Sequence, residues 1–431
     1  MIHPPIRLVW GLLLGVLSFA SIAMAQEEEA HLRVVDGVVY RSETAIRIKA
    51  LHDAEAAQRG TALSNMVPAM ARVAECGGNT LSFDAFGLNE TGSSISPEAV
   101  AAITAFAERA KDQRMGVMLR VVAGISDPDV RLRAARTVAK AFKKDTRIFF
   151  LLDGPDSAEL CKVFKRHAPN AVVVGAWNAD ILVLESPQAQ RYEATPHLVV
   201  GTLPEDPALH FILEANPENF ARMDAAFMNE VELGEGLMDP IVLTQAERNE
   251  GFVPLFNGRS LAGWWVFGDN PAGFHVSDCG EIEWVMEGAG ALMSAKRYGD
   301  FILRLDYKLL PGYNSGIFLR APREARQSRI GMEFQLHGDH GLETPNDDCT
   351  GAIYKVVPPL VVASRPGATW NELEIMMKGP MLKATLNGVV VQDINLDDHE
   401  ELRYRLRRGF IGLQDHSNYV SFRNIRIKEL K

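Results

Sequence analysis

The feature that most constrains the fold is a change of hydrophobic periodicity halfway along the chain. Residues 31–217 alternate short apolar runs with amphipathic stretches, whereas from Phe252 onward polar and apolar side chains alternate with a period of two between Gly, Pro and Asn-Gly breaks. The first pattern is typical of βα units and the second of antiparallel strands. Because the two kinds of sheet bury their faces differently, we expect a multidomain chain, α/β followed by all-β.

The N-terminal half contains candidate strands separated, in its first part, by amphipathic helices. The runs RIFFLL and AVVVGA are continuously apolar, as expected for strands covered on both faces. Helices are predicted over 64–76, 97–112 and 127–143, the second with Ser96 as N-cap and Pro97 in its first turn. Helices are nearly absent after the fifth to seventh strands, and a complete barrel takes about 250 residues, so we expect a degenerate (β/α)-barrel-like domain over residues 26–228. The candidate strands are 34–40, 79–86, 116–122, 146–153, 171–175, 181–185, 197–202 and 211–215.

The C-terminal half contains strand patterns without helices. Asn387-Gly388 between two alternating runs predicts a two-residue hairpin. Many short strands at regular spacing indicate an antiparallel sandwich, which we place over residues 251–431. Residues 229–250 are expected to form a linker, and Thr244 and Glu247 fit a capping box that opens one short helix in it. The candidate strands are 301–309, 315–320, 331–337, 351–356, 372–377, 383–386, 389–392, 409–414 and 420–428.

The first 25 residues have the composition of a secretory signal peptide. Arg7 is the only charged residue before Glu27, residues 8–20 are apolar, and Ala23 and Ala25 supply small residues at the −3 and −1 positions. We therefore expect residues 1–25 to be removed and the protein to be exported, periplasmic or secreted; the alternative is an uncleaved anchor. An oxidising compartment permits disulfides, and four cysteines allow three full pairings, with buried thiols as the alternative. The cysteines are Cys76, Cys161, Cys279 and Cys349.

A polar row on one otherwise apolar strand marks a candidate site. In residues 331–337, alternation turns the apolar side chains to one face and leaves Glu333, Gln335 and His337 on the other. Polar side chains that hydrogen-bond hydroxyls, beside aromatic faces that stack on a ring, are what a saccharide cleft requires. The alternative is a sheet that simply faces water. Further polar and aromatic candidates for this cleft are Asn314, Arg320, Tyr354, Trp370, Gln414 and His416.

The C-terminal domain resembles the 3-keto-disaccharide hydrolase domain family. The resemblance covers about residues 244–431, in the right order throughout, and rests on these runs: GFVPLFNGRSLAGWW (251–265), PGYNSGIFLR (311–320), GMEFQLHGD (331–339), TGAIYKVVPP (350–359), GATWNELEIMMKG (367–379) and GFIGLQDHSNYVSFRNIRIKEL (409–430). That family is similar in fold to concanavalin-like lectins and glucanases, so the resemblance implies a curved two-sheet jelly roll. It also implies an enzyme that acts on glycosides whose C3 hydroxyl has been oxidised to a ketone.

The resemblance implies roles for the polar row. Retaining glucanases of this fold carry Glu-x-Asp-x-Glu on the equivalent strand, and retaining hydrolysis needs two carboxylates about 5–5.5 Å apart, but this strand has only Glu333. Cleavage of a 3-ketoglycoside does not need two carboxylates. Its ketone acidifies the C2 proton, so that one base can start an elimination, which the addition of water completes. Glu333 or His337 could be that base, His416 an acid or base, and Arg320 or a bound cation the group that polarises the ketone. We expect Asn314, Gln335, Tyr354, Trp370 and Gln414 to bind substrate.

The cofactor and partner expectations are few. The sequence indicates no definite cofactor, and one set of candidate ligands could hold a divalent cation, with a solvated acidic loop as the alternative. The net charge of −10 disfavours a nucleic acid or an anionic membrane as partner, since both bind to basic protein surfaces. The expected partner is a glycoside or oligosaccharide. The candidate cation ligands are His337, Asp339, His340, Asp347, Asp348 and His416.

The barrel-like segment offers a competing site. Active sites of such barrels lie at the carboxyl ends of the strands, and the stretch 77–87 is similar to the early βα units of sugar-cleaving barrels. No Asn-Glu dipeptide ends the fourth strand, where Asp153-Gly154 stands. The alternatives to a sandwich enzyme are therefore a glycosidase in the barrel and a non-catalytic glycan-binding protein. The residues expected at these strand ends are Asp84, Arg120, Asp153, Trp177, Asn178, Glu185 and Glu214.

The signal-peptide hypothesis gives a direct prediction. N-terminal sequencing of the exported protein should begin at Gln26, because signal peptidase cuts after small residues at −3 and −1. A mature protein that still begins at Met1 would contradict it.

Overall fold

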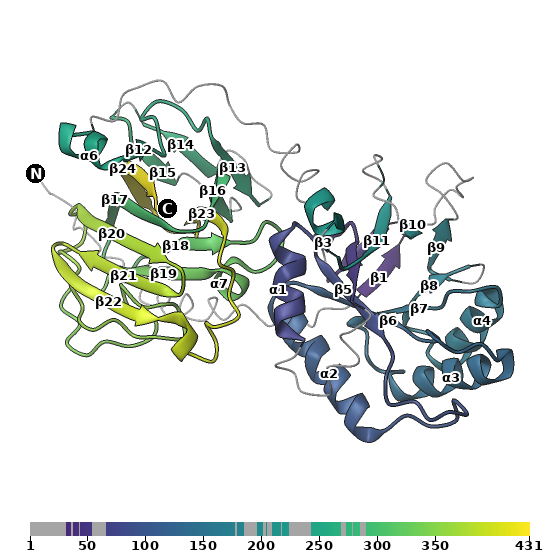
Figure 1. Ribbon diagram of the computed structural model, residues 1–431. Coiled ribbons are helices and arrows are strands. Elements are labelled where there is room, and N and C mark those ends of the chain that lie inside the picture. The colour runs from purple at the N-terminus through teal and green to yellow at the C-terminus, as the bar shows by residue number, and fades with distance from the viewer. Residues whose placement is uncertain are drawn as a thin grey trace, which may run out of the picture.

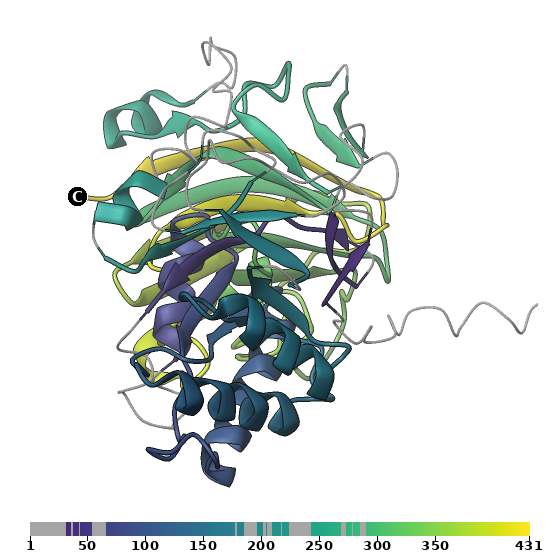
Figure 2. The ribbon, with the colours of Figure 1, turned by 90° about the vertical axis from the view of Figure 1, so that its right-hand side faces the viewer.

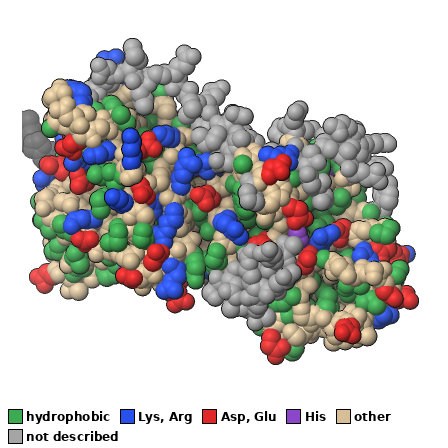
Figure 3. Space-filling view, viewed as in Figure 1, with side chains coloured by type: hydrophobic (Ala, Val, Ile, Leu, Met, Phe, Trp, Pro, Cys, Tyr) green, Lys and Arg blue, Asp and Glu red, His purple; other side chains and the backbone are tan. Residues whose placement is uncertain are grey.

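The computed structural model contains two domains that lie side by side, a helix-covered barrel and an all-β sandwich (Figure 1). The expected signal peptide lies outside the described residues. No helix in the described part of the chain is both long and apolar enough to cross a bilayer. On the face in Figure 3, acidic and basic side chains are interspersed over both domains. The structure describes residues 32–35, 38–42, 44–53, 66–176, 179–184, 196–200, 204, 209–216, 218–223, 243–268, 273–277, 279–284 and 290–431.

Eight parallel strands close the barrel in the order β10–β11–β4–β5–β6–β7–β8–β9, which confirms the barrel prediction. The strands are β4 (Lys49–His52), β5 (Thr80–Asp84), β6 (Gly116–Arg120), β7 (Ile148–Leu151), β8 (Val172–Gly175), β9 (Ile181–Leu184), β10 (His197–Val200) and β11 (His210–Glu214). Four helices follow β4 to β7 in turn: α1 (Val67–Glu75), α2 (Pro97–Asp112), α3 (Pro128–Ala141) and α4 (Ser157–His167). Ser96 caps α2 as expected, because its side chain accepts from the Ala99 N–H. Between β8 and β11 the described residues contain no helix, so the barrel is closed but incompletely covered.

Residues 34–40 do not form a barrel strand, so this expectation was wrong. They contribute to a separate antiparallel sheet of β1 (Leu32–Val35), β2 (Val38–Arg41) and β3 (Thr44–Ala45). Leu32 and Val39 pack with the apolar barrel interior, and the Leu32 N–H donates to the Thr146 carbonyl just before β7. The small sheet therefore closes the amino-terminal end of the barrel.

The second domain is a sandwich of two antiparallel sheets, as predicted. One runs β14–β15–β24–β17–β20–β21–β22 with β12 beside β24, and the other runs β13–β16–β23–β18–β19. Residues 351–356 make only isolated bridges, at Ile353, where a strand was expected. The capping box of Thr244 and Glu247 opens α6 (Gln245–Glu250). The strands and the short helix between them are β12 (Val253–Pro254), β13 (Trp264–Phe267), β14 (Phe274–Val276), β15 (Ile282–Trp284), β16 (Ala291–Tyr298), β17 (Phe301–Leu309), β18 (Asn314–Ala321), α7 (Gln327–Ile330), β19 (Met332–His337), β20 (Asn371–Lys378), β21 (Met381–Leu386), β22 (Val389–Asn395), β23 (Gly409–Gln414) and β24 (Val420–Glu429).

The apolar side chains at alternate positions along the strands fill the space between the two sheets. On β19, Met332, Phe334 and Leu336 are fully buried in this core, so Glu333 and Gln335 point to the opposite face of the five-stranded sheet. None of the four cysteines forms a disulfide; three are buried and Cys279 is exposed. The sandwich is therefore stabilised by its apolar core, and β19 presents its polar row outward.

The sandwich docks on the amino-terminal end of the barrel. Ala325, Ile330 and Leu406 of the sandwich join the hydrophobic cluster of the barrel helices. Glu324 accepts from Lys49 at the start of β4 at 2.6 Å and from Asn79, just before β5, at 2.9 Å. Figure 2, viewed from the barrel side, shows the barrel helices in front of the sandwich sheets. The carboxyl end of the barrel therefore points away from the sandwich.

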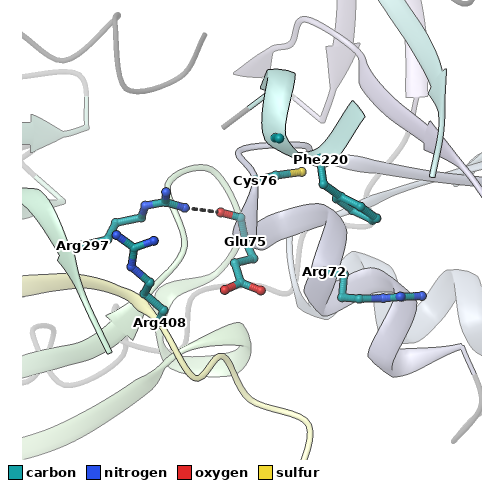
Figure 4. A pocket seen from close by; sticks show the side chains of 7 residues that line it. Arg72, Glu75, Cys76, Phe220, Arg297 and Arg408 are labelled. Atoms are coloured by element: carbon teal, nitrogen blue, oxygen red, sulfur yellow. Dashed lines mark hydrogen bonds between the residues drawn. The ribbon is translucent and has the colours of Figure 1, made fainter. Parts of the chain in front are cut away.

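A cavity of about 250 Å³ remains between the domains beside this contact (Figure 4). The Arg297 side chain from β16 crosses the gap and donates to the Glu75 carbonyl, at the end of α1, at 2.9 Å. Arg408 lies next to Arg297, and Arg72 lines the barrel side. The interface thus combines apolar packing with charged groups that bond across it.

The Glu324 contacts predict a measurable interface energy. Replacing Glu324→Ala leaves the partly buried Lys49 and the buried Asn79 without this acceptor, which should lower the free energy of unfolding by about 1–3 kcal/mol. Urea denaturation followed by intrinsic fluorescence measures the change. Asp393→Ala removes an exposed pair with Lys383 and is the matched control, expected to cost less than about 1 kcal/mol. Equal effects of the two substitutions would mean that Glu324 does not join the domains.

Candidate active site

The polar row of β19 opens into a cavity of about 250 Å³, which we call the sandwich cavity. Its volume lies near the lower end of ligand pockets, which are about 300–1,000 Å³. The wall combines amide, carboxyl, imidazole and guanidinium groups with two phenylalanines. The lining residues are Arg114, Phe267, Gly290, Asn314, Phe318, Arg326, Gln327, Ser328, Glu333, Gln335, Tyr354, Gln414, Asp415 and His416.

Glu333 is the buried carboxyl group of this cavity. It pairs with Phe318 across β18 and β19, and only 3% of it is exposed. Gly316, on β18, provides the space, because a Cβ there would lie 2.5 Å from Oε1 of Glu333. Burial raises the pKa of Glu333 to about 8, while the Gln414 amide and the charge of Arg326 act in the opposite direction. At neutral pH the group is therefore mostly a neutral acid, and it becomes a base of matching strength near pH 8.

Amide side chains surround this carboxyl group. The Gln335 amide nitrogen donates to Oδ1 of Asn314 at 3.1 Å, and Gln335 is only 1% exposed. The side-chain oxygens of Gln335 and Gln414 are buried and accept no hydrogen bond from the described residues. Buried acceptors without donors are costly, so these two oxygens are available to a ligand that donates hydrogen bonds.

Aromatic and titratable residues complete the wall. Phe318 packs with Phe267 in a small apolar cluster on the cavity face of the five-stranded sheet. The Tyr354 N–H donates to the Glu333 carbonyl at 3.0 Å, which ties the loop after β19 to the strand. His416 follows β23 and is exposed at the rim. Hence five of the expected site residues besides Glu333 line one cavity: Asn314, Gln335, Tyr354, Gln414 and His416.

Arg320 does not belong to this site, which corrects the expectation that it polarises a ketone. Its side chain is fully buried and donates to the carbonyls of Gly299 and Gly379 and to Asp300. Strict alternation would put Arg320 on the cavity face with Phe318, but the register of β18 against β23 shifts between Phe318 and Ala321. Arg320 also has a left-handed backbone, with φ 49°. This bulge turns the side chain away from the cavity.

Trp370 and His337 are also absent from the cavity wall. Trp370 precedes β20 in the other sheet, and its ring is covered by Arg423 at 3.9 Å and by Lys308 at 4.6 Å. Trp370 therefore lies outside the sandwich cavity. His337 ends β19, and its backbone N–H donates to Thr350. Of the polar row, only Glu333 and Gln335 line the cavity.

The candidate cation ligands do not converge. Within the described residues, no group of three His, Cys, Asp or Glu side chains has the geometry to hold a metal ion. Asp339 instead accepts from the Thr350 N–H and the Ser364 hydroxyl, and Asp347 and Asp348 pair with Lys355. His340 contacts the Ser364 carbonyl. These residues order the loop after β19, and the structure offers no support for a cation there.

Two arginines of the cavity were missed from the sequence. Arg326 precedes α7, in a segment without periodicity, and its charge acts on Glu333. Arg114 comes from the barrel, in the turn between α2 and β6, and reaches the cavity across the domain interface. No pattern within one domain could have revealed a residue that the other domain supplies.

The barrel candidates lie at the opposite end of the barrel from the sandwich. Arg120 and Asp153 form an ion pair at 2.6 Å, and His52 lies 3.3 Å from Asp84. Against the effect of burial, the charges of Asp153, Asp84 and Glu214 raise the pKa of Arg120. The four expected residues therefore do come together, but Arg120 neutralises Asp153. Trp177, Asn178 and Glu185 lie outside the described residues.

Comparison with known proteins shows what the sandwich is similar to. Residues 251–428 match the family described as the 3-keto-alpha-glucoside-1,2-lyase-like domain, as the sequence resemblance suggested. A relative from Bacteroides thetaiotaomicron named 3-keto-disaccharide hydrolase is 27% identical over 233 residues, covering 42% of this chain and 79% of the relative. A crystal structure described as a glycosyl hydrolase from Parabacteroides distasonis is 25% identical, covers 44% of this chain and 99% of its own, and has a TM-score of 0.39. A carbohydrate-binding module from Bacillus subtilis is 15% identical, covers 39% and 96%, and has a TM-score of 0.29.

The raised pKa of Glu333 predicts how stability depends on pH. Between about pH 4.5 and 8 the folded protein keeps a proton on Glu333 that the unfolded chain has lost, so the stability falls as pH rises through this window and is constant above it. Glu333→Gln removes this dependence. The unfolding free energy of the variant minus that of wild type should therefore increase by about 2–5 kcal/mol from pH 4 to pH 9, as measured by urea denaturation. The same difference between variant and wild type at both pH values would contradict the buried state of this carboxyl.

Proposed function

We propose, from the family that residues 251–428 match, that the sandwich cavity cleaves the glycosidic bond of 3-keto-glycosides. The observation that carries the proposal is the buried Glu333 carboxyl group, with a pKa near 8, among amide oxygens that lack donors. One titratable group beside hydroxyl-binding amides suits a substrate whose ketone already acidifies the neighbouring carbon. It does not suit retaining hydrolysis, which needs a second carboxylate about 5–5.5 Å away.

The reaction proceeds by elimination and hydration. Ionised Glu333 takes the proton from C2, and the electron pair of that bond forms the enolate with C3 and its oxygen. The enolate then restores the ketone, C1 and C2 become doubly bonded, and the C1–O bond breaks. The leaving oxygen takes a proton and departs as an alcohol. Water then adds across the double bond, with hydroxyl to C1 and hydrogen to C2, so that the net change is hydrolysis.

The other groups of the cavity stabilise charge and transfer protons. Arg326, whose charge acts on Glu333, replaces Arg320 as the cation that stabilises the enolate oxygen. His416 at the rim is the acid that protonates the leaving group, in exchange with solvent. Gln335, Asn314 and Gln414 hold the ring hydroxyls, and Phe267 and Phe318 provide an apolar surface beside them. The substrate is thus a glycoside, and export, argued from residues 8–25, would bring the enzyme to extracellular or periplasmic glycosides.

Glu333 variants test the proposal. With a 3-keto-disaccharide as substrate, Glu333→Gln should lower kcat about 10²–10⁴-fold, because it keeps the shape but removes the base. His416→Ala should also lower the rate. For wild type, kcat/KM should rise with pH and level off above about pH 8, as the base ionises.

Glu374→Gln, on the other sheet and paired with Arg304, is the matched control and should leave the rate unchanged. A rate that falls as pH rises through 8 would make Glu333 an acid and contradict the elimination step. Binding of the disaccharide without release of monosaccharide would make the sandwich a glycan-binding module. If Glu333→Gln and His416→Ala both keep wild-type rates, the reaction belongs elsewhere, and Asp153 and Glu214 of the barrel are next.

A further inference from the structure

The barrel supplies part of the wall of the sandwich cavity. Arg114, in the turn between α2 and β6, lines the same cavity as Glu333 and Gln414. The sandwich family match begins only at residue 251, so Arg114 is outside it. The barrel therefore adds a cationic group to a site that lies otherwise in the sandwich.

The backbone at Arg114 is held on both sides. Arg114 has a left-handed conformation, with φ 54°, which is uncommon for a residue with a large side chain. Its N–H donates to the Lys111 carbonyl at 2.9 Å, and its own carbonyl accepts from Nη1 of Arg41. The preceding carbonyl, of Gln113, accepts from the Arg326 N–H at 2.8 Å, across the domain interface. The turn is therefore fixed against the sandwich, and it presents Arg114 at a defined place.

The guanidinium of Arg114 has no counter-ion among the described residues. The side chain is exposed, it forms no hydrogen bond or ion pair there, and the neighbouring charges are those of two cations, Arg326 and Arg41. Two other cations of the interface have acidic partners: Lys49 pairs with Glu324, and Arg109 pairs with Glu401. Arg114 and Arg326 face one cavity as like charges, which repel each other, and a bound anion reduces that repulsion.

We propose that Arg114 binds an oxyanion group, such as a carboxylate or sulfate, carried by the glycoside. Its planar guanidinium offers paired N–H donors that match such groups. The proposal rests on the proposed function for the reaction, but it concerns which glycosides the cavity selects. It assigns to the barrel a role in specificity and not in the chemical step.

The test uses Arg114→Asn and Arg114→Lys in the full-length protein. Asn is among the residues that best tolerate a left-handed backbone, so the fold is retained, and Lys keeps the charge. Arg136→Asn, an exposed arginine on α3 outside the cavity, is the matched control. Three substrates are compared: phenyl 3-keto-glucoside, its 4-carboxyphenyl analogue and the phenyl 3-keto-glucuronide. The last two place the anion on the leaving group or on the sugar.

Arg114→Asn should lower kcat/KM about 10–100-fold for one of the two anionic substrates and less than about threefold for the neutral one. The substrate that loses more identifies the part of the glycoside that carries the anion. Arg114→Lys should recover part of the loss, and Arg136→Asn should change nothing. Equal losses on all three substrates, or none, would overturn the proposal.

A binding measurement separates this inference from the proposed function. In the Glu333→Gln background, titration calorimetry compares methyl glucuronide with methyl glucoside, with and without Arg114→Asn. If wild type cleaves none of the substrates but Arg114→Asn still weakens glucuronide binding selectively, the reaction is wrong and the anion site stands. If wild type cleaves them and Arg114→Asn changes no charge preference in rate or binding, the anion site is wrong and the reaction stands.

Discussion

The burial of one carboxyl group in β19 is the constraint on which the site depends. Glu333 stands between core residues on a strand whose neighbours are apolar, and burial raises its pKa to about 8. Such a group is costly unless the surroundings accommodate it. Gly316 leaves room for its carboxyl group, and the Gln414 amide and Arg326 partly offset the loss of water. The same arrangement that lowers stability at high pH provides a base near neutrality.

The two domains share this site because of how they dock. The sandwich covers the amino-terminal end of the barrel, through Glu324 and an apolar contact at Ile330. The segment that makes this contact leads into α7 and carries Arg326 to the cavity. The turn before β6 brings Arg114 from the other side. The carboxyl end of the barrel, with its Arg120–Asp153 pair, stays remote from the sandwich. The contact that stabilises the pair of domains also shapes the cavity wall.

Periodicity predicted the architecture well, because each pattern reports which faces are buried. Alternation in β19 correctly placed Glu333 opposite the core, and the Ser96 cap and the Thr244 capping box were found from short motifs. Periodicity failed to predict the site where the strand geometry departs from regular alternation. A bulge in β18 turns Arg320 away from the cavity, and Trp370 stacks under cations of the other sheet. Arg114 could not be predicted, since no sequence pattern encodes how two domains meet.

The central claim is that the sugar binds beside Glu333, in a cavity to which the barrel contributes Arg114. The most direct measurement is a crystal structure of the Glu333→Gln protein soaked with a 3-keto-disaccharide. The account predicts electron density for the ligand in the sandwich cavity, with C2 of the oxidised ring next to the side chain of residue 333 and ring hydroxyls on Gln335 and Gln414. Density at the carboxyl end of the barrel, beside Asp153 and Glu214, with the sandwich cavity empty of sugar, would contradict it.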